Sequence, residues 1–108
     1  MLVSFATKTL VRERPERVAD GHGGYEDDWS DPDELTLENC SMQPGASAED
    51  LVNREGVRID WTVFVGGHPD VRFGDRVKDG HTPYAVVGEP EKWPLLEHTK
   101  ILLSRWAG

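Results

Sequence analysis

The sequence has 108 residues, of which 37% are hydrophobic and 30% charged, enough for one domain with a modest core. Its formal net charge is −8, and the acids are concentrated in residues 20–34, which contain no Lys or Arg. Tight binding to DNA irrespective of base sequence is excluded, because affinity for phosphate comes mainly from Lys and Arg.

Hydropathy and cysteine content narrow the class further. No apolar run approaches the roughly 20 residues of a membrane-spanning helix, so we expect no membrane partner. The start, MLVSFATKTLVRER, lacks the basic, apolar and small-residue regions of a signal peptide. The single cysteine, Cys40, excludes an internal disulfide and a multi-cysteine zinc site. These features predict a protein that is made and kept in a reducing cytoplasm.

The first elements in chain order are two strands separated by a long loop. Residues 3–11 (VSFATKTLV) are rich in β-forming side chains and predict a strand. An acidic, glycine-containing loop is expected from about residue 14 to residue 35. Residues 35–43 predict the second strand. Its apolar side chains change face midway, which indicates a bulge near Asn39.

A short helix and a clear strand are expected next. Residues 48–55 predict the helix, with Ser47 as its N-cap and Gly56 where it ends. Residues 57–65 alternate between apolar and other side chains, which is typical of a strand with one buried face. Trp61 lies in the middle of that face and is therefore expected in the core.

Residues 76–88 (RVKDGHTPYAVVG) predict two short strands around an Asp79-Gly80 turn. Residues 95–106 have helical spacing, yet we predict a strand, because the other strands need their sheet edges covered. The expected fold is therefore all-β. It is a small antiparallel β-barrel or sandwich of five to six strands, with one short helix and a long acidic loop between the first two strands.

No pattern in the sequence predicts catalysis. A nucleophile elbow, a P-loop and a Gly-x-Gly-x-x-Gly stretch are all absent, so we expect neither an enzyme nor a cofactor. The acidic run lacks the ordered ligands of an EF-hand calcium loop. His22 near Asp20 is the best start for a metal site, but a solvated loop histidine is the simpler interpretation.

The remaining tryptophans allow more than one interpretation. Trp93 follows a turn and Trp106 lies near the end of the sequence, so each is a candidate for the core edge or for a contact between subunits. Trp29 lies among acids, where a solvated segment rarely keeps a tryptophan without use.

Residues 71–93 contain a series of short motifs: Asp75-Arg76-Val77, Gly80, Tyr84-Ala85-Val86-Val87-Gly88, Pro90 and Trp93. This order resembles the second half of phage head-to-tail stopper proteins, a family within the head–tail joining (head closure) proteins. Upstream, residues 40–50 (CSMQPGASAED) resemble the family's small-residue strand ending in Gln-Pro, followed by a polar helix start. With the first and last strands, the resemblance extends over nearly the whole chain.

The resemblance implies a structural virion protein at the head–tail interface, made in the host bacterial cytoplasm. Family members form a ring, here expected to be a dodecamer, below the portal and its adaptor protein, and tail terminator or other tail proteins attach beneath it. By position, the long loop would line the DNA channel. The expected channel residues are Asp20, Gly21, His22, Gly23, Gly24, Tyr25, Glu26, Asp27, Asp28 and Trp29. Their acids would repel phosphate, so packaged DNA would pass without specific binding.

Other functions stay open at this point. A neighbouring head–tail adaptor or a tail-completion protein would also form a ring. A cytoplasmic SH3-like module that holds a peptide with its hairpin tips and Trp93 belongs to another class. Trp93 and Trp106 are the expected interface residues in the ring.

Overall fold

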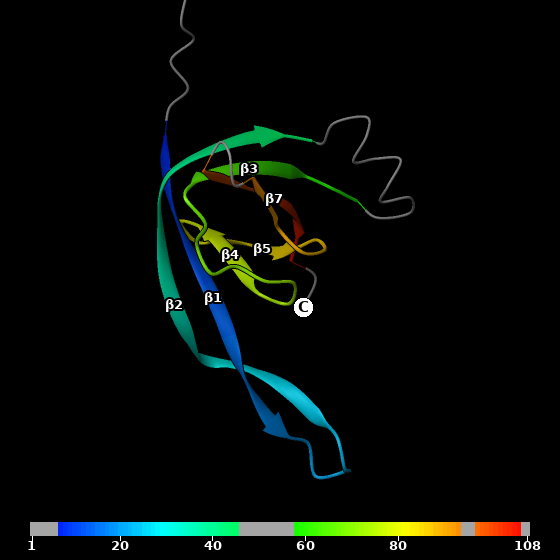
Figure 1. The fold of residues 1–108 in the computed structure, drawn as a ribbon. Coiled ribbons are helices and arrows are strands. Elements are labelled where there is room, and N and C mark those ends of the chain that lie inside the picture. Colours follow the sequence, from blue (N-terminus) through cyan, green and yellow to red (C-terminus); the bar gives the residue numbers. More distant parts are fainter. Residues whose placement is uncertain (1–6, 46–57, 94–96, 107–108) are drawn as a thin grey trace, which may run out of the picture.

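A computed structural model describes residues 7–45, 58–93 and 97–106, in which seven strands form one antiparallel sheet (Figure 1). The strands are β1 (Lys8–Ala19), β2 (Tyr25–Pro44), β3 (Trp61–Gly66), β4 (Arg76–Asp79), β5 (Thr82–Val86), β6 (Glu91–Trp93) and β7 (His98–Arg105). The predicted all-β antiparallel class is confirmed. The additional strand is the short β6, and the helix predicted over 48–55 lies outside the described residues.

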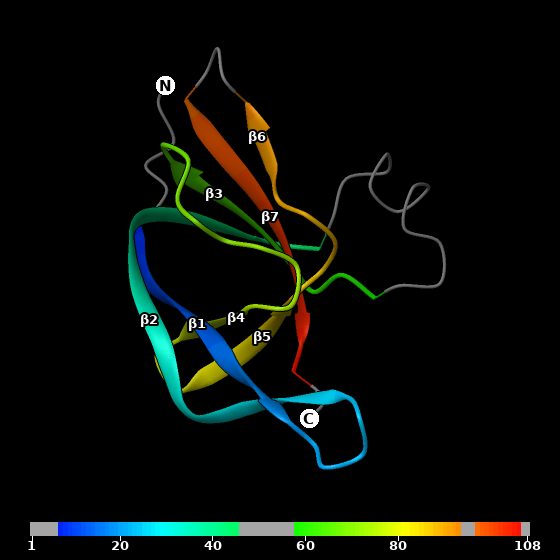
Figure 2. The ribbon, with the colours of Figure 1, turned by 60° about the horizontal axis from the view of Figure 1, so that its bottom comes forward.

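The sheet closes into a barrel. Its strand order is β3-β2-β1-β4-β5-β7-β6, and β7 also pairs with β3. One edge of β7 is divided, because its first residues pair with β6 and its last residues pair with β5. Figure 2 shows β1 and β2 crossing one side of the barrel and continuing beyond it.

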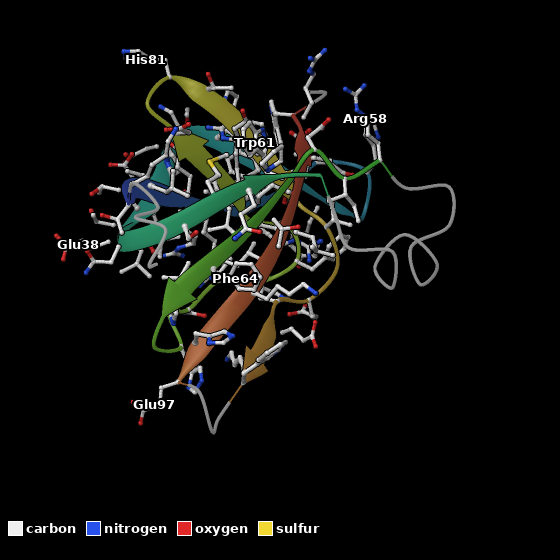
Figure 3. All side chains as sticks on the ribbon, turned by 90° about the horizontal axis from the view of Figure 1, so that it is seen from above. Glu38, Arg58, Trp61, Phe64, His81 and Glu97 are labelled. Atoms are coloured by element: carbon white, nitrogen blue, oxygen red, sulfur yellow. The ribbon has the colours of Figure 1, made fainter. Side chains whose placement is uncertain are left out.

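The core lies inside the barrel and is made of small and medium apolar side chains. Its buried members are Leu10, Leu37, Cys40, Val63, Val65, Val71, Val77, Val86, Ile101 and Leu103. Trp61 packs against this cluster from a partly buried position, so the core prediction for it holds in part. In Figure 3, the labelled Glu38, Arg58, His81 and Glu97 lie at the periphery, consistent with their exposure.

The bulge predicted near Asn39 is confirmed. Leu10 pairs with Leu37 but Lys8 pairs with Cys40, so β2 has an extra residue there, and Asn39 has a φ of 56°. Leu37 and Cys40 are three residues apart and would face opposite sides of a regular strand. The bulge turns both into the core, where each is buried.

The strand predicted for the last segment is also confirmed, although periodicity alone favoured a helix. In β7, Thr99, Ile101 and Leu103 are fully buried. The predicted turn between β4 and β5 is present as well. Asp79 pairs with Thr82, and Gly80 supplies the positive φ of 62° that the tight turn requires.

The structure replaces the predicted long loop over 14–35 with an ordered β-hairpin. Residues 8–19 and 25–44 are strands, and only residues 20–24 form the turn between them. Strand β1 places Arg14 opposite Asp33 and Arg17 opposite Asp27, so two of the acids lie across the hairpin from a basic residue. Within the described residues, no helix has the length and apolarity needed to cross a membrane.

Candidate functional site

The hairpin continues past the barrel as a two-stranded arm, which we define as residues 14–34. Strand β4 pairs with β1 only at residues 11–13, and β3 pairs with β2 only at residues 41–44. Neither β4 nor β3 reaches the arm, so among the described strands the two arm strands form backbone hydrogen bonds only with each other. A lone two-stranded hairpin is marginally stable in water, so contacts beyond the hairpin must hold the arm in place.

The tip of the arm is closed by Asp20. Its carboxylate accepts hydrogen bonds from the backbone N–H groups of His22 (2.7 Å) and Gly24 (3.1 Å). The turn also needs glycine, because Gly21 and Gly23 have φ values of 83° and 88°. Asp20 and His22, the best sequence candidates for a metal site, therefore stabilise a turn. The part of the chain that the structure describes contains no group of three or more metal-ligand side chains.

The two faces of the arm differ in chemistry. Residues directly opposite in a hairpin share a face, and Arg17 pairs with Asp27 and Ala19 with Tyr25. These four residues form the inner face, on which the Arg17 guanidinium lies 5.6 Å from the centre of the Tyr25 ring. The outer face is made of Glu16, Val18, Glu26 and Asp28. It has three acids and no base.

A kink separates the arm tip from the barrel. Arg14 pairs with Asp33 but Glu16 pairs with Asp28, so β2 fits residues 29–32 opposite a single residue of β1. Asp28 Oδ1 accepts hydrogen bonds from the hydroxyl and the backbone N–H of Ser30, at 2.6 and 2.9 Å. These bonds lower the pKa of Asp28, the hydroxyl bond most.

The kink brings Trp29 onto the outside of the barrel. Its ring lies 4.2 Å from the Arg76 guanidinium and packs edge-on against Trp106, with ring centres 4.9 Å apart. Arg76 is also 5.1 Å from the Trp106 ring, and its Nε donates to Glu13 Oε1 at 2.8 Å. We call Trp29, Arg76 and Trp106, with the buried Glu13, the aromatic latch. It joins the arm to β4 and to the end of β7.

Space for the latch comes from small residues on the barrel surface. Arg76 pairs with Ala85 on β5, and Ala85 pairs with Ser104 on β7. Paired residues share a face, so these short side chains lie beside Arg76 on the same side of the sheet. The latch thus forms a small cluster outside the barrel, separate from the core.

A second contact fixes the base of the arm. Arg14 donates from Nε and Nη2 to the two carboxylate oxygens of Asp75, both at 2.9 Å. Asp75 is 3% exposed and also accepts the backbone N–H of Arg72 at 2.8 Å. Arg14 Nη1 reaches Asp70 at 3.0 Å. The hydrogen bonds that Arg14 donates to Asp75, and then the one to Asp70, raise the pKa of Arg14 above its ordinary value.

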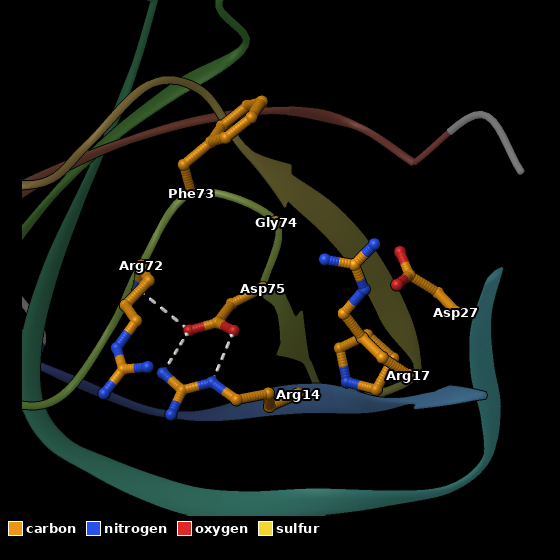
Figure 4. Close-up of a pocket in the computed structure, with 8 residues that line it drawn as sticks. Arg14, Arg17, Asp27, Arg72, Phe73, Gly74 and Asp75 are labelled. Carbon is orange, nitrogen blue, oxygen red and sulfur yellow. Dashed lines mark hydrogen bonds and ion pairs between the residues drawn. The ribbon is translucent and has the colours of Figure 1, made fainter. Parts of the chain in front are cut away.

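Between the inner face of the arm and the loop before β4 lies an open cleft of about 380 Å³ (Figure 4). Its lining residues are Arg14, Pro15, Arg17, Asp27, Arg72, Phe73, Gly74 and Asp75. Phe73 on one wall and Tyr25 on the inner face are each 66% exposed. Among the described residues they are the exposed large hydrophobic side chains, which makes this region the candidate functional surface.

The structure brings only part of the predicted site together. Asp20–Asp28 share the arm tip, whereas Trp29 packs on its own barrel and contacts Trp106, so these two tryptophans have partners within the chain. Trp93 lies elsewhere, 4.7 Å from the His98 ring. Whether Trp93 and Trp106 also contact another subunit stays a prediction.

Sequence reasoning missed residues that build the cleft and the latch, namely Arg14, Arg17, Arg72, Phe73, Asp75 and Arg76. Asp75-Arg76-Val77 was singled out only as part of a family-like motif. In the structure these three residues have different roles: Asp75 binds Arg14, Arg76 is part of the latch and Val77 is part of the core. The signal for Phe73 was a large aromatic beside Gly74 in a loop between charged residues.

The fold and its site define a small antiparallel β-barrel with a protruding hairpin arm. No protein-family model matches the sequence, and a search of curated proteins gives no match. Solved structures share the fold, among them two that cover most of the chain. One is the solution structure of protein SF1141 from Shigella flexneri 2a, with a TM-score of 0.66, 15% identity, and 99% of this chain and 98% of that chain covered. The other is a chain of the virion of a native gene transfer agent particle, with a TM-score of 0.63, 20% identity, and 89% and 90% covered.

Proposed function

We propose that this chain is a structural, non-enzymatic virion protein that acts as a head-to-tail stopper. The observation that carries the proposal is the likeness in fold, over most of both chains, to a protein of a gene transfer agent virion. The sequence motifs of residues 71–93, which resemble those of stopper proteins, support the same class. This likeness also favours the virion class over a cytoplasmic peptide-binding module.

In the proposed assembly, copies of the chain form a closed ring between the portal adaptor and the tail proteins. The arm supports this arrangement, because it projects from the barrel as a hairpin with which no other described strand pairs. An arm directed at the ring axis would narrow the DNA exit channel. It would do so as an ordered hairpin, stiffened by the latch, rather than as a flexible loop.

The charge of the arm fits a channel that blocks DNA without binding it. Residues 14–34 contain eight acidic and two basic side chains, so the arm as a whole repels the phosphate backbone. Closure would then be steric, through arms that meet near the axis. DNA could leave once the arms move, because no phosphate contacts would have to be broken.

Electron microscopy of intact particles that contain this chain tests the assignment. We expect a closed ring of the chain between the adaptor and the tail. If the chain is absent from purified particles, it is not a virion protein and the proposal is wrong. A ring next to the portal, or a ring within the tail, would identify the adaptor or tail-completion protein instead.

A deletion tests the role of the arm. Replacing residues 17–27 with a two-residue Asn-Gly turn removes the tip but keeps the latch and the barrel. Tailless particles with this change should fill with DNA and then lose it. As a matched control, an arm of full length with the exposed His22 changed to Ala should retain DNA, because only the backbone N–H of His22 contributes to the turn. Normal DNA retention by the deletion would place the arms outside the channel.

A further inference from the structure

The cleft beneath the arm has the composition of a protein-binding hot spot. Its walls carry Phe73 and, on the adjoining inner face, Tyr25, both 66% exposed. Aromatic residues and arginine are enriched at the centres of protein interfaces, where they contribute most of the binding energy. A volume of about 380 Å³ is enough for a few side chains of a partner, but the cleft is too open to enclose a small ligand.

The charged side chains of the cleft differ in how many ion pairs and hydrogen bonds they form. Arg14 and Asp75 neutralise each other through two hydrogen bonds. Arg72 uses Nε to reach Asp70 at 3.1 Å. Arg17 makes no hydrogen bond or ion pair with any described residue, although Asp27 is its direct neighbour across the hairpin. Figure 4 shows its guanidinium extended into the space between the arm and the loop that carries Phe73. The donors still available in the cleft are therefore cationic.

The same molecule carries a matching surface. The outer face of the arm presents Glu16, Glu26 and Asp28 on the side opposite Arg17. One face of the hairpin is therefore acidic, whereas the other carries Asp27 and Arg17, an arginine that forms no ion pair with a described residue. Two surfaces that complement each other but lie on different sides of one chain produce a head-to-tail contact. Such a contact generates a closed ring when the rotation between copies closes.

We propose that the cleft of one copy binds the acidic outer face of the arm of a second copy. Carboxylates of the incoming arm pair with Arg17 and Arg72, and Phe73 packs against the hairpin. This inference rests on the proposed ring function and specifies which surfaces meet in it. It also covers the tip of the arm, which lies beyond the latch and the Arg14–Asp75 contact.

Cysteine trapping tests the contact on the purified full-length chain at millimolar concentration. Phe73→Cys in one copy is mixed with Glu26→Cys in a second copy that carries a larger tag, and disulfide formation is driven by a mild oxidant. Both variants keep the buried Cys40, and the unmodified chain measures how much disulfide Cys40 forms by itself. The matched control pair is His81→Cys, at an exposed turn outside the cleft, with Glu26→Cys.

We expect the mixed adduct of positions 73 and 26 in roughly tenfold higher yield than the control, because docking raises the local concentration of the two thiols. Equal yields would overturn the cleft assignment. A ring seen in particles would then leave the proposed function standing, whereas absence of the chain from particles would remove both.

Charge exchange gives an independent readout. Arg17→Glu should weaken self-association at least roughly tenfold. Adding Glu26→Lys in the same chain should restore it, because the acid introduced at position 17 of each cleft then faces the base introduced at position 26 of the next copy and the charges again have opposite sign. Both positions are exposed, so the fold should be unaffected, and circular dichroism checks this. Failure of the second change to rescue the first would contradict the pairing. Binding of double-stranded DNA that depends on Arg17 would also overturn it.

Discussion

Asp75→Asn is the sharpest test of what holds the arm and the loop before β4 together. The change keeps the shape of the side chain but removes its charge and one acceptor oxygen. Asp75 accepts three hydrogen bonds, two from Arg14 and one from the backbone N–H of Arg72. The amide NH₂ of asparagine would face at least one of these donors, so at least one charged hydrogen bond is lost, each worth about 1.5–3 kcal/mol.

Removing one partner of a fully buried ion pair costs about 3–5 kcal/mol. The Arg14 side chain is 24% exposed and keeps Asp70, so water and the second acid offset part of the loss. We expect the free energy of unfolding to fall by about 3 kcal/mol, which lowers Tm by roughly 10–20 °C in a domain of this size. Urea denaturation followed by tryptophan fluorescence measures the change.

The matched control is Asp70→Asn. Asp70 binds the same arginine, but its side chain is 54% exposed, so this change should lower the free energy of unfolding much less than Asp75→Asn does. If the two variants lie within about 1 kcal/mol of each other, the bidentate pair with Arg14 does not hold this region, and the reasoning given for the base of the arm is refuted.

Three further outcomes are expected. Trp106→Ala removes the contact with Trp29 and should cost about 1–3 kcal/mol, with faster hydrogen exchange in the arm, and unchanged exchange there would argue against the latch. Burial raises the pKa of the Cys40 thiol, so a thiol reagent should label it only as the chain unfolds, and native labelling at the rate of a free cysteine would contradict this. The backbone N–H of Arg105, 2.7 Å away, lowers the pKa of Asp60, so its contribution to stability is present above the ordinary carboxyl pKa and is lost as the pH falls through the lowered value. Asp60→Asn should therefore reduce the pH dependence of the unfolding free energy below about pH 4. If that pH dependence stays the same in the variant, the Asp60 carboxylate does not contribute to stability in this way.

Features encoded locally were predictable from the sequence. The turn at Gly80 follows from the dipeptide at its start, and the bulge at Asn39 follows from a change in the phase of apolar side chains. The last strand could be predicted only with global reasoning, because the spacing of residues 95–106 is helical. Its strand form comes from pairing with β3 and β5, which no local pattern reveals.

The arm was not predictable, because its order comes from distant parts of the chain. An acidic run with three glycines reads as a solvated loop when it is considered alone. Trp29 is held by Arg76 and Trp106, which follow it by 47 and 77 positions. Arg14 is held by Asp75, a further 61 positions along. The cleft depends on the same long-range contacts, so the sequence could not show that Phe73 and Arg17 line one cleft.

The double pairing of β7 has a consequence for biogenesis. This strand, at residues 98–105, closes the barrel by joining β3 on one edge and β5 on the other. Until β7 emerges from the ribosome, β3 and β5 each have an edge without this partner. The core also lacks Ile101 and Leu103, which β7 contributes. The barrel therefore cannot close before β7 has emerged, and closure has the slow kinetics of strands paired across long stretches of sequence. A prematurely terminated product would aggregate instead of competing with complete subunits for places in an assembly.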